Sequence, residues 1–455
     1  MPDPIEPLVE YCVGTKYKGL PEDIIEFTKL CVLDLIGVLI AGFDAPGCGI
    51  AVEFVKEFGG KPESSILRYG AKAPCPGASF ANSIMARALD FDAGMRPGVH
   101  LNASTIPTAF AVGELMGSSG RDVLAAIAVG EDLAVRINQT TNLGITYGGF
   151  DPTGICGVFA TTVVAGKLFE LTEHELRNAL GIAFNRAGGS FQNNIDGALM
   201  VRFLQGFVSA TGVISALLAR KGVSGPLNLF DGIYGYYKLF SHGVYDKSFL
   251  LNKLGKEFLT PRYTMFKRWP SCGATLSVID GTLKLKEEEQ IEPENIDEII
   301  VVVGPYAYNL TGQPFTTSEN PVVKAQFSLQ YAVANVILRG RPTLKHYRME
   351  YISDPLVQRM MNKIHVVKDE SIETEFKAEL IVKMRGGEIK KIECGVPKGH
   401  PANPITKDDI LRKFYECVKS SSKPLPDEVV KEVIDKILNM EKLSNIEYLI
   451  ELLRC

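Results

Sequence analysis

The chain has 455 residues, of which 46% are hydrophobic and 22% charged, a composition typical of globular proteins and a length that exceeds one simple core. Its formal net charge of −4 gives no electrostatic basis for binding nucleic acid or an anionic membrane. The nine cysteines are scattered and include no C-x-x-C pair, which predicts buried thiols in a reducing compartment, the cytoplasm.

The N-terminal part of the chain has the features of helices. Its first twelve residues lack the basic stretch of a signal peptide. Residues 21–42 begin with proline and acidic residues and continue as a long apolar run, which predicts a helix. The most apolar part, 30–42, contains Asp34 and is shorter than the roughly 20 residues of a membrane span. We therefore expect a buried core helix there.

Further helices are predicted along the first 265 residues. Small and apolar side chains at 154–171 and 206–222 favour tight helix–helix packing, and residues 121–139 also have a helical pattern. Thr172 and Glu175 match the capping box Ser/Thr-x-x-Glu, which predicts the start of another helix.

Residues 266–396 have a different pattern. A β-branched run at 296–307 predicts a strand, and two strand-like runs within 376–396 meet at Gly386-Gly387, which indicates a hairpin. A helix is predicted between these elements, at 324–340.

These elements together predict a mainly α fold with an α+β part. We expect an all-helical domain formed by residues 1–265 and 397–455, because the pattern becomes helical again after residue 396. A smaller α+β domain, 266–396, is then inserted into it.

The sequence lacks the common motifs of nucleotide, metal and serine chemistry. It contains no G-x-G-x-x-G, P-loop, G-x-S-x-G or H-E-x-x-H motif. No two of its six histidines lie at i,i+4 spacing, and none pairs with a nearby cysteine. We therefore expect no metal site, and chemistry by ordinary acidic and basic side chains.

The segment ALDFDAGMRPGVHLNAS carries the strongest indication of such chemistry. Asp90 and Asp92 follow an apolar helical run, where a carboxylate opposes the helix dipole by roughly 0.3–1 kcal/mol, and His100 follows on a loop rich in Gly and Pro. A carboxylate can orient a histidine ring and raise its basicity, which gives a general base near neutral pH. In the alternative, structural interpretation, one aspartate caps a turn or pairs with Arg87 or Arg96.

The same segment, with the STIPTAFAVGE that overlaps its end, resembles the signature helix and loop of the MmgE/PrpD family. That family includes 2-methylcitrate dehydratase, cis-aconitate decarboxylase and iminodisuccinate epimerase. Further segments resemble family segments in the same order: GFDPTGICGVFATTVVAGKLFEL, GALMVRFLQGFVSATGVISALLARKGVSGP, FKRWPSCGATLSVID, NPVVKAQFSLQYAVANVILRG and GHPANPITKDDILRKF. The resemblance covers nearly the whole chain. It implies a homodimer of a helical domain and an α+β lid, a cleft between them, no cofactor, and small di- or tricarboxylate substrates.

The resemblance also implies catalytic roles. Asp90 matches the first family aspartate and is expected to orient a base or carry a proton, and His100 is expected to be the acid or base. Tyr331 matches the family tyrosine of the lid helix, where a phenol can donate to a carboxylate or act as a weak acid. Simple helix packing is the alternative for Tyr331.

Basic residues that resemble family positions are candidates for binding a substrate carboxylate, which needs a fixed cation. They are Lys267 with its neighbour Arg268, for which a solvated pair at a hinge is the alternative, and Arg202; Arg96 on the loop is a further candidate. Cys272 matches a family cysteine and is included with the substrate-binding residues, although a buried structural thiol is the simpler role.

Several positions depart from the family pattern. Asp151, Leu204 and Leu276 stand where the pattern has histidine, Val201 stands where it has lysine, and Gly94 replaces a common threonine. The lost basic groups favour a less charged, partly apolar substrate over a tricarboxylate. Asp151 becomes a candidate second base, facing the loop histidine across the cleft.

The first functional hypothesis is a cofactor-independent lyase, either a dehydratase or a decarboxylase, that acts next to a carboxylate of a small organic acid. An epimerase with bases on both faces of the substrate is an alternative. A family member that binds without catalysis is a second alternative, which the lost basic residues support.

Overall fold

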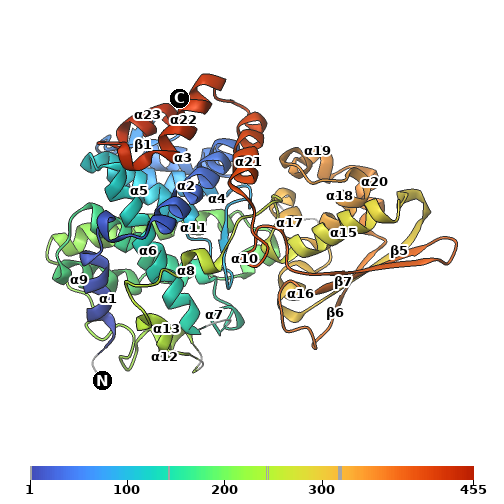
Figure 1. Cartoon of the computed structure of the whole chain (residues 1–455), viewed down its shortest axis with the longest axis horizontal. Coiled ribbons are helices and arrows are strands. Elements are labelled where there is room, and N and C mark those ends of the chain that lie inside the picture. The colour runs from blue at the N-terminus through green and yellow to red at the C-terminus, as the bar shows by residue number, and fades with distance from the viewer. Residues whose placement is uncertain (1–2, 142–143, 242, 244, 316–319, 455) are drawn as a thin grey trace.

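The computed structural model describes residues 3–141, 144–241, 243, 245–315 and 320–454. Figure 1 shows a large helical part beside a smaller part that contains a sheet. The fold is mainly α with an α+β part, as the sequence predicts.

The helical part has long helices that pack around α8. Its elements are α1 (Ile5–Gly14), α2 (Glu22–Gly42), α3 (Cys48–Phe58), α4 (Cys75–Arg87), α5 (Asn102–Met116), α6 (Gly120–Thr141), α7 (Gly144–Tyr147), α8 (Pro152–Leu168), α9 (Glu173–Phe184), α10 (Gln192–Asp196), α11 (Met200–Arg220), α12 (Tyr236–Phe240), α13 (Ser248–Leu251) and α14 (Thr260–Tyr263), with the short strands β1 (Ser64–Ile66), β2 (Ala71–Ala73), β3 (Gly94–Met95) and β4 (Thr264–Met265). The predicted helices at 21–42, 121–139 and 154–171 and the capping box at Thr172 are confirmed.

Small residues let the central helices approach closely. Every residue of α8 except Lys167 is buried, and α8 packs against α5, α6, α9 and α11. A Cβ on Gly212 of α11 would lie 2.4 Å from Oγ1 of Thr161 on α8, so only glycine allows this crossing. α11 begins at Met200, before the predicted start at residue 206. It is long and apolar enough to cross a membrane by length and composition alone, yet 61% of its apolar window is buried, as in a core helix.

The C-terminal helices return to the helical part. They are α21 (Lys407–Ser420), α22 (Asp427–Leu438) and α23 (Glu447–Arg454). Lys413 Nζ lies 2.7 Å from Oδ1 of Asp34, the acidic residue within the apolar α2, and Phe414 packs where Gly37 leaves room. These helices share one hydrophobic core with the N-terminal helices. The domain boundaries at 265/266 and 396/397 stay a prediction.

The α+β part is a mixed sheet with helices on one face (Figure 1). Its elements are α15 (Leu276–Glu288), β5 (Ile296–Val303), α16 (Pro305–Thr311), α17 (Pro321–Gln326), α18 (Leu329–Arg339), α19 (Met349–Ile352), α20 (Pro355–Met361), β6 (Ile364–Lys368), β7 (Ala378–Met384) and β8 (Ile389–Cys394). The strand order is β6-β5-β7-β8, in which β5 is parallel to β6 and antiparallel to β7. The hairpin at Gly386-Gly387 is confirmed, with Gly387 at φ +84°.

Two predicted elements of this part need correction. The strand predicted at 296–307 ends at Val303, because Gly304 and Pro305 begin α16. The single helix predicted at 324–340 is two helices, α17 and α18. Ser328 separates them: its hydroxyl accepts a hydrogen bond from the backbone N–H of Tyr331 and caps α18.

Candidate active site

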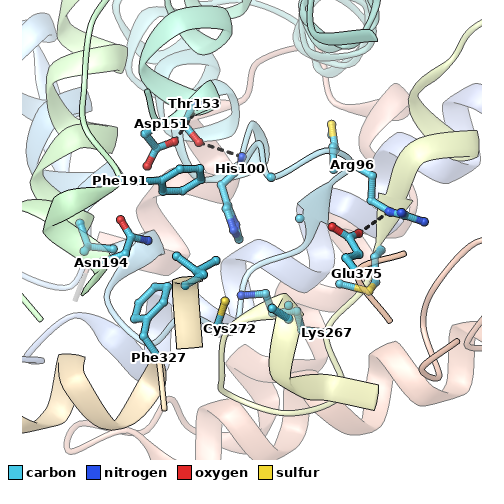
Figure 2. Close-up of a pocket in the computed structure, with 18 of the residues that line it drawn as sticks. Arg96, His100, Asp151, Thr153, Phe191, Asn194, Lys267, Cys272, Phe327 and Glu375 are labelled. Atoms are coloured by element: carbon cyan, nitrogen blue, oxygen red, sulfur yellow. Dashed lines mark hydrogen bonds and ion pairs between the residues drawn. The ribbon is translucent and has the colours of Figure 1, made fainter. Parts of the chain in front are cut away.

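A cavity lies between the helical part and the α+β part. Including its open mouth, it encloses about 640 Å³. One wall comes from the loop that follows α4, the start of α8, and α10 and α11. The facing wall comes from the segment after β4, from α16 and from the residues before β7. Figure 2 shows side chains from both walls reaching into the space between them.

His100 stands in this cavity with an aspartate behind it. Its Nδ1 lies 2.8 Å from Oδ2 of Asp92, which is fully buried. Burial and then the charge of Arg87 lower the pKa of His100 below its usual value, while Asp92 acts in the opposite direction. The ring is therefore neutral near neutral pH. With Nδ1–H donated to Asp92, Nε2 is the nitrogen free to accept a proton.

The loop backbone fixes the position of this histidine. Met95 and Val99 exchange two backbone hydrogen bonds of 2.6 and 2.8 Å, and Gly98 takes a positive φ of +61° within that turn. A Cβ on Gly94 would lie 3.4 Å from Cε1 of His100, so glycine leaves room for the ring there. The predicted reason for the Gly residues, a sharp turn beside the histidine, agrees with this geometry.

Asp90 does not contact His100, which corrects its predicted role as the orienting carboxylate. Its Oδ1 pairs with Arg87 and lies 2.8 Å from Nζ of Lys267. Burial raises the pKa of Asp90, but Arg87 and then Lys267 outweigh it and hold that pKa below its usual value. The structural alternative, an aspartate paired with Arg87, is thus what Asp90 does, and Arg87 also lies 3.4 Å from Asp92.

Lys267 lines the cavity. Its Nζ donates to the backbone oxygen of Asp90 at 3.0 Å and to the Asp90 carboxylate. An ammonium carries three N–H groups, so one remains for a ligand. Figure 2 shows the Lys267 side chain extending toward the same space as the His100 ring. The predicted carboxylate-binding residue is therefore placed beside the candidate base.

Asp151 also lines the cavity, near His100 (Figure 2). It is the N-cap of α8, where its Oδ1 accepts the backbone N–H of Thr153 at 2.9 Å. The hydroxyl of Thr153 in turn accepts the backbone N–H of His100 at 3.0 Å. Burial raises the pKa of Asp151, so this carboxyl can hold a proton more readily than an exposed aspartate and serve as a proton donor.

Arg96 lies on the cavity wall and contacts residues of the α+β part. Its Nε pairs with Glu375, its Nη1 lies 2.9 Å from Nε2 of His400, and its guanidinium stacks 4.7 Å from the centre of the Phe376 ring. Figure 2 shows the Arg96–Glu375 pair to one side of His100. Its contacts make Arg96 a link between the two parts of the molecule, and its predicted role in substrate binding stays a prediction.

Of two other predicted residues, Cys272 and Tyr331, the structure places only Cys272 at the cavity. Cys272 lines the cavity, and burial raises its pKa to about 12, so the thiol is not a nucleophile near neutral pH. Tyr331 is fully buried and its hydroxyl donates to the backbone oxygen of His346. It is not among the described lining residues, which favours its packing role over the predicted catalytic one.

Arg202 and Arg268 are also not among the described residues that line the cavity. Arg202 is buried and donates to the backbone oxygen of Pro46 at 2.8 Å, away from the space that a substrate would fill. The side chain of Arg268 is 42% exposed and its guanidinium lies over Trp269. Neither matches the predicted role in direct substrate binding.

Sequence reasoning missed several residues of the site. Tyr306, on α16, lines the cavity, and burial raises its pKa well above the usual value. Asn194 on α10 and Gln205 on α11 line it as well. The position of Tyr306, just after a strand and a Gly-Pro turn, was a sequence signal that could have indicated a site residue. Asn194 and Gln205 gave no such signal, since isolated Asn and Gln are common on any helix.

Metal chemistry has no visible ligand set here. Within the described ranges, no group of three or more His, Cys, Asp or Glu side chains is arranged to hold a metal ion. The groups that converge on the cavity are a histidine with a buried aspartate, a lysine with a spare donor and a carboxyl of raised pKa. These groups define an acid–base site beside a cation.

The comparisons place the chain in a known family. The MmgE/PrpD N-terminal domain matches residues 6–247, and the MmgE/PrpD C-terminal domain matches residues 269–438. The chain belongs to the MmgE/PrpD family, as its motifs indicate.

Named relatives resemble the chain along nearly their whole length. The cis-aconitate decarboxylase-like protein oryM of Aspergillus oryzae is 23% identical over 98% of this chain and 96% of its own length. A cis-aconitate decarboxylase of Aspergillus terreus is 23% identical over 96% of this chain and 93% of its own length.

Proposed function

We propose that this protein is a cofactor-independent lyase that acts by proton transfer next to a carboxylate of a small organic acid. The observation that carries the proposal is the Asp92–His100 pair, whose ring stands in the cavity beside Lys267. Family membership and the decarboxylase names of the relatives support a lyase. Whether the reaction is a dehydration or a decarboxylation is left to experiment.

The residues divide the chemistry as follows. Lys267 holds the substrate carboxylate with its spare N–H, which draws electron density from the adjacent carbon. Nε2 of neutral His100 takes the proton, and Asp92 stabilises the imidazolium that forms. In a dehydration, protonated Asp151 gives its proton to the departing hydroxyl. In a decarboxylation, His100 removes no proton first: the bond to the carboxylate breaks as carbon dioxide leaves, and Asp151 in its protonated form delivers the proton that the resulting carbanion takes up.

Proton NMR in heavy water tests this proposal. The enzyme is mixed with hydroxy-, amino- and unsaturated carboxylates, and His100→Ala is run in parallel. New vinyl signals, or the loss of an unsaturated acid with release of carbon dioxide, establish a lyase. Exchange or inversion at the carbon next to the carboxylate without any alkene establishes the epimerase instead. Catalysis that persists in His100→Ala contradicts the assigned base, and no reaction across the panel favours a binding protein.

We further propose that two copies associate and act in the cytoplasm. The side chains of Phe54, Phe58, Phe207 and Ile214 on α3 and α11 are 47%, 78%, 51% and 44% exposed. Exposed apolar patches of this kind mark association surfaces. Light scattering should give twice the mass of one chain, and Phe207→Glu should halve it, whereas Ile389→Glu on β8 should not. The described cysteines, eight free and buried thiols, fit a reducing compartment.

A further inference from the structure

The cations of the cavity are already paired with carboxylates. Arg87 contacts Asp90 and Asp92, and Arg96 contacts Glu375. Lys267 shares Asp90 but keeps one N–H. A second or third substrate carboxylate would have to break one of these buried pairs or remain without a cation, and both are costly. The charges of the site therefore suit a ligand with one carboxylate.

One wall of the cavity is apolar. Val201, Leu310 and Phe327 line it and belong to one hydrophobic cluster, against which Phe191 packs. Figure 2 shows the rings of Phe191 and Phe327 on the side of the cavity where Asn194 lies. Val201 stands where the family pattern has lysine, so the chain has hydrocarbon where a basic group would meet a further carboxylate. This wall suits an alkyl part of a ligand.

Two amides in the cavity have oxygens without partners. Oδ1 of Asn194 and Oε1 of Gln205 are buried and accept no hydrogen bond from any described residue. The two residues are 3% and 2% exposed. A buried carbonyl oxygen without a donor costs free energy, and a ligand that brings a hydroxyl or an amino group would supply the donor.

We infer that the cavity selects a monocarboxylate that carries a hydroxyl or amino group and an alkyl substituent, with Asn194 and Gln205 accepting from the donor group and Val201 contacting the alkyl group. This inference rests on the proposed function in taking a carboxylate as the ligand. It adds the substrate class and three specificity-determining residues.

The test measures binding of three probes to the full chain by isothermal titration calorimetry at pH 7.5. The probes are 2-hydroxy-4-methylpentanoate, its analogue 4-methylpentanoate without the hydroxyl, and citrate. We expect the hydroxy acid to bind about tenfold more tightly than 4-methylpentanoate, since one or two hydrogen bonds are lost, and at least tenfold more tightly than citrate. Equal or tighter binding of citrate, equal binding with and without the hydroxyl, or no binding of either monocarboxylate overturns the inference.

Variants assign the selectivity to residues. Asn194→Leu and Gln205→Leu should reduce the advantage of the hydroxy acid over 4-methylpentanoate to less than threefold. Val201→Lys should shift preference toward citrate, and the size-matched Val201→Leu should not. Thermal unfolding shows which variants fold, and the probe order in the unmodified protein decides the inference even where a variant does not.

The same samples separate this inference from the proposed function. If the probe order holds but no acid shows turnover or hydrogen exchange that depends on His100, the inference stands and the lyase proposal fails. If His100-dependent turnover occurs on citrate or another tricarboxylate, with monocarboxylates bound weakly, the lyase proposal stands and the inference fails.

Discussion

Asp92 Oδ2 lies 2.8 Å from Nδ1 of His100, while the carboxylate of Asp90, two residues earlier, is directed to Arg87 and Lys267. The two aspartates therefore have separate tasks. Asp92 sets the tautomer of the histidine, and Asp90 holds the cation that we expect to bind substrate. A positive φ of +49° at Asp90 turns the chain between them, a conformation that aspartate tolerates better than most residues.

Asp92→Asn should lower turnover by roughly 10²–10⁴-fold. The amide can donate as well as accept, so it can stabilise the wrong tautomer and cannot stabilise the imidazolium. Turnover is followed by NMR in heavy water with the acid of the panel that the unmodified enzyme converts. Asp408→Asn, an exposed site on α21, is the matched control and should keep full activity. Full activity in Asp92→Asn would remove Asp92 from the mechanism.

The fold follows largely from the sequence because its signals are local. The apolar run at 21–42, the capping box at Thr172 and the glycine pair at 386–387 each specify one element without reference to distant residues. The break at Ser328 was missed because an apolar helical pattern continues through it. Only the serine cap, which depends on a single side chain, ends one helix and starts the next.

The site was only partly predictable, because its contacts join distant segments. His100 and Lys267 were found by their motifs, and both line the cavity. The choice between Asp90 and Asp92 was wrong, because spacing along the chain does not show which carboxylate a turn directs toward the ring. Tyr331 was predicted from its motif alone, and the hydrogen bond of its buried hydroxyl to a backbone oxygen became visible only in the fold.

The pH dependence of His100 gives a second prediction. Its pKa in the folded chain is below the usual value, chiefly through burial and then Arg87. The unfolded chain therefore binds a proton first as pH falls from about 6.5. Stability is fully present above that pH and is lost as pH falls toward the folded pKa. We expect NMR titration of the His100 ring to give a pKa below 6.5. Turnover should decrease with falling pH as the ring becomes protonated.

His100→Gln provides the control for that titration. It should remove the part of the acid-induced stability loss that the buried histidine causes. A His100 pKa above 6.5 would contradict the assigned balance, in which burial and Arg87 outweigh the attraction of Asp92.

The Asp90–Lys267 pair should be strongly coupled. Both side chains are 1% exposed, and Oδ2 of Asp90 has no hydrogen-bond partner among the described residues. Lys267→Met should cost roughly 3–5 kcal/mol of unfolding free energy, because removing one partner leaves a buried charge less compensated. The double variant with Asp90→Asn should cost less than the sum of the single changes.

Urea unfolding of the four proteins in that cycle measures the coupling. Lys284→Met, which removes an exposed pair with Glu288 at 3.9 Å, is the control and should change stability by less than about 1 kcal/mol. Additive effects of Asp90→Asn and Lys267→Met would show that Arg87 alone compensates the carboxylate.

Glu131 gives a prediction away from the cavity. It is 1% exposed on α6, and burial raises its pKa to about 8. Thr105 Oγ1 lies 2.6 Å from Glu131 Oε1 and 3.0 Å from the backbone oxygen of Leu101. Thr105 Oγ1 donates to both acceptors, and its bond to Glu131 lowers the pKa of that carboxyl, but burial outweighs this effect. Because the folded pKa is raised, the stability linked to this group is complete below about pH 4.5 and is lost as pH rises through about 8.

Glu131→Gln keeps an acceptor for the Thr105 hydroxyl and has no proton to lose. Its stability relative to the unmodified protein should therefore increase with pH between about 4.5 and 8, by up to about 1.4 kcal/mol per pH unit. Urea unfolding at several pH values measures the difference, in which the other buried carboxyls cancel because both proteins contain them. Glu287→Gln, at an exposed position on α15, should give a profile parallel to the unmodified protein. A parallel profile for Glu131→Gln would mean that Glu131 is ionised in the core, despite its burial.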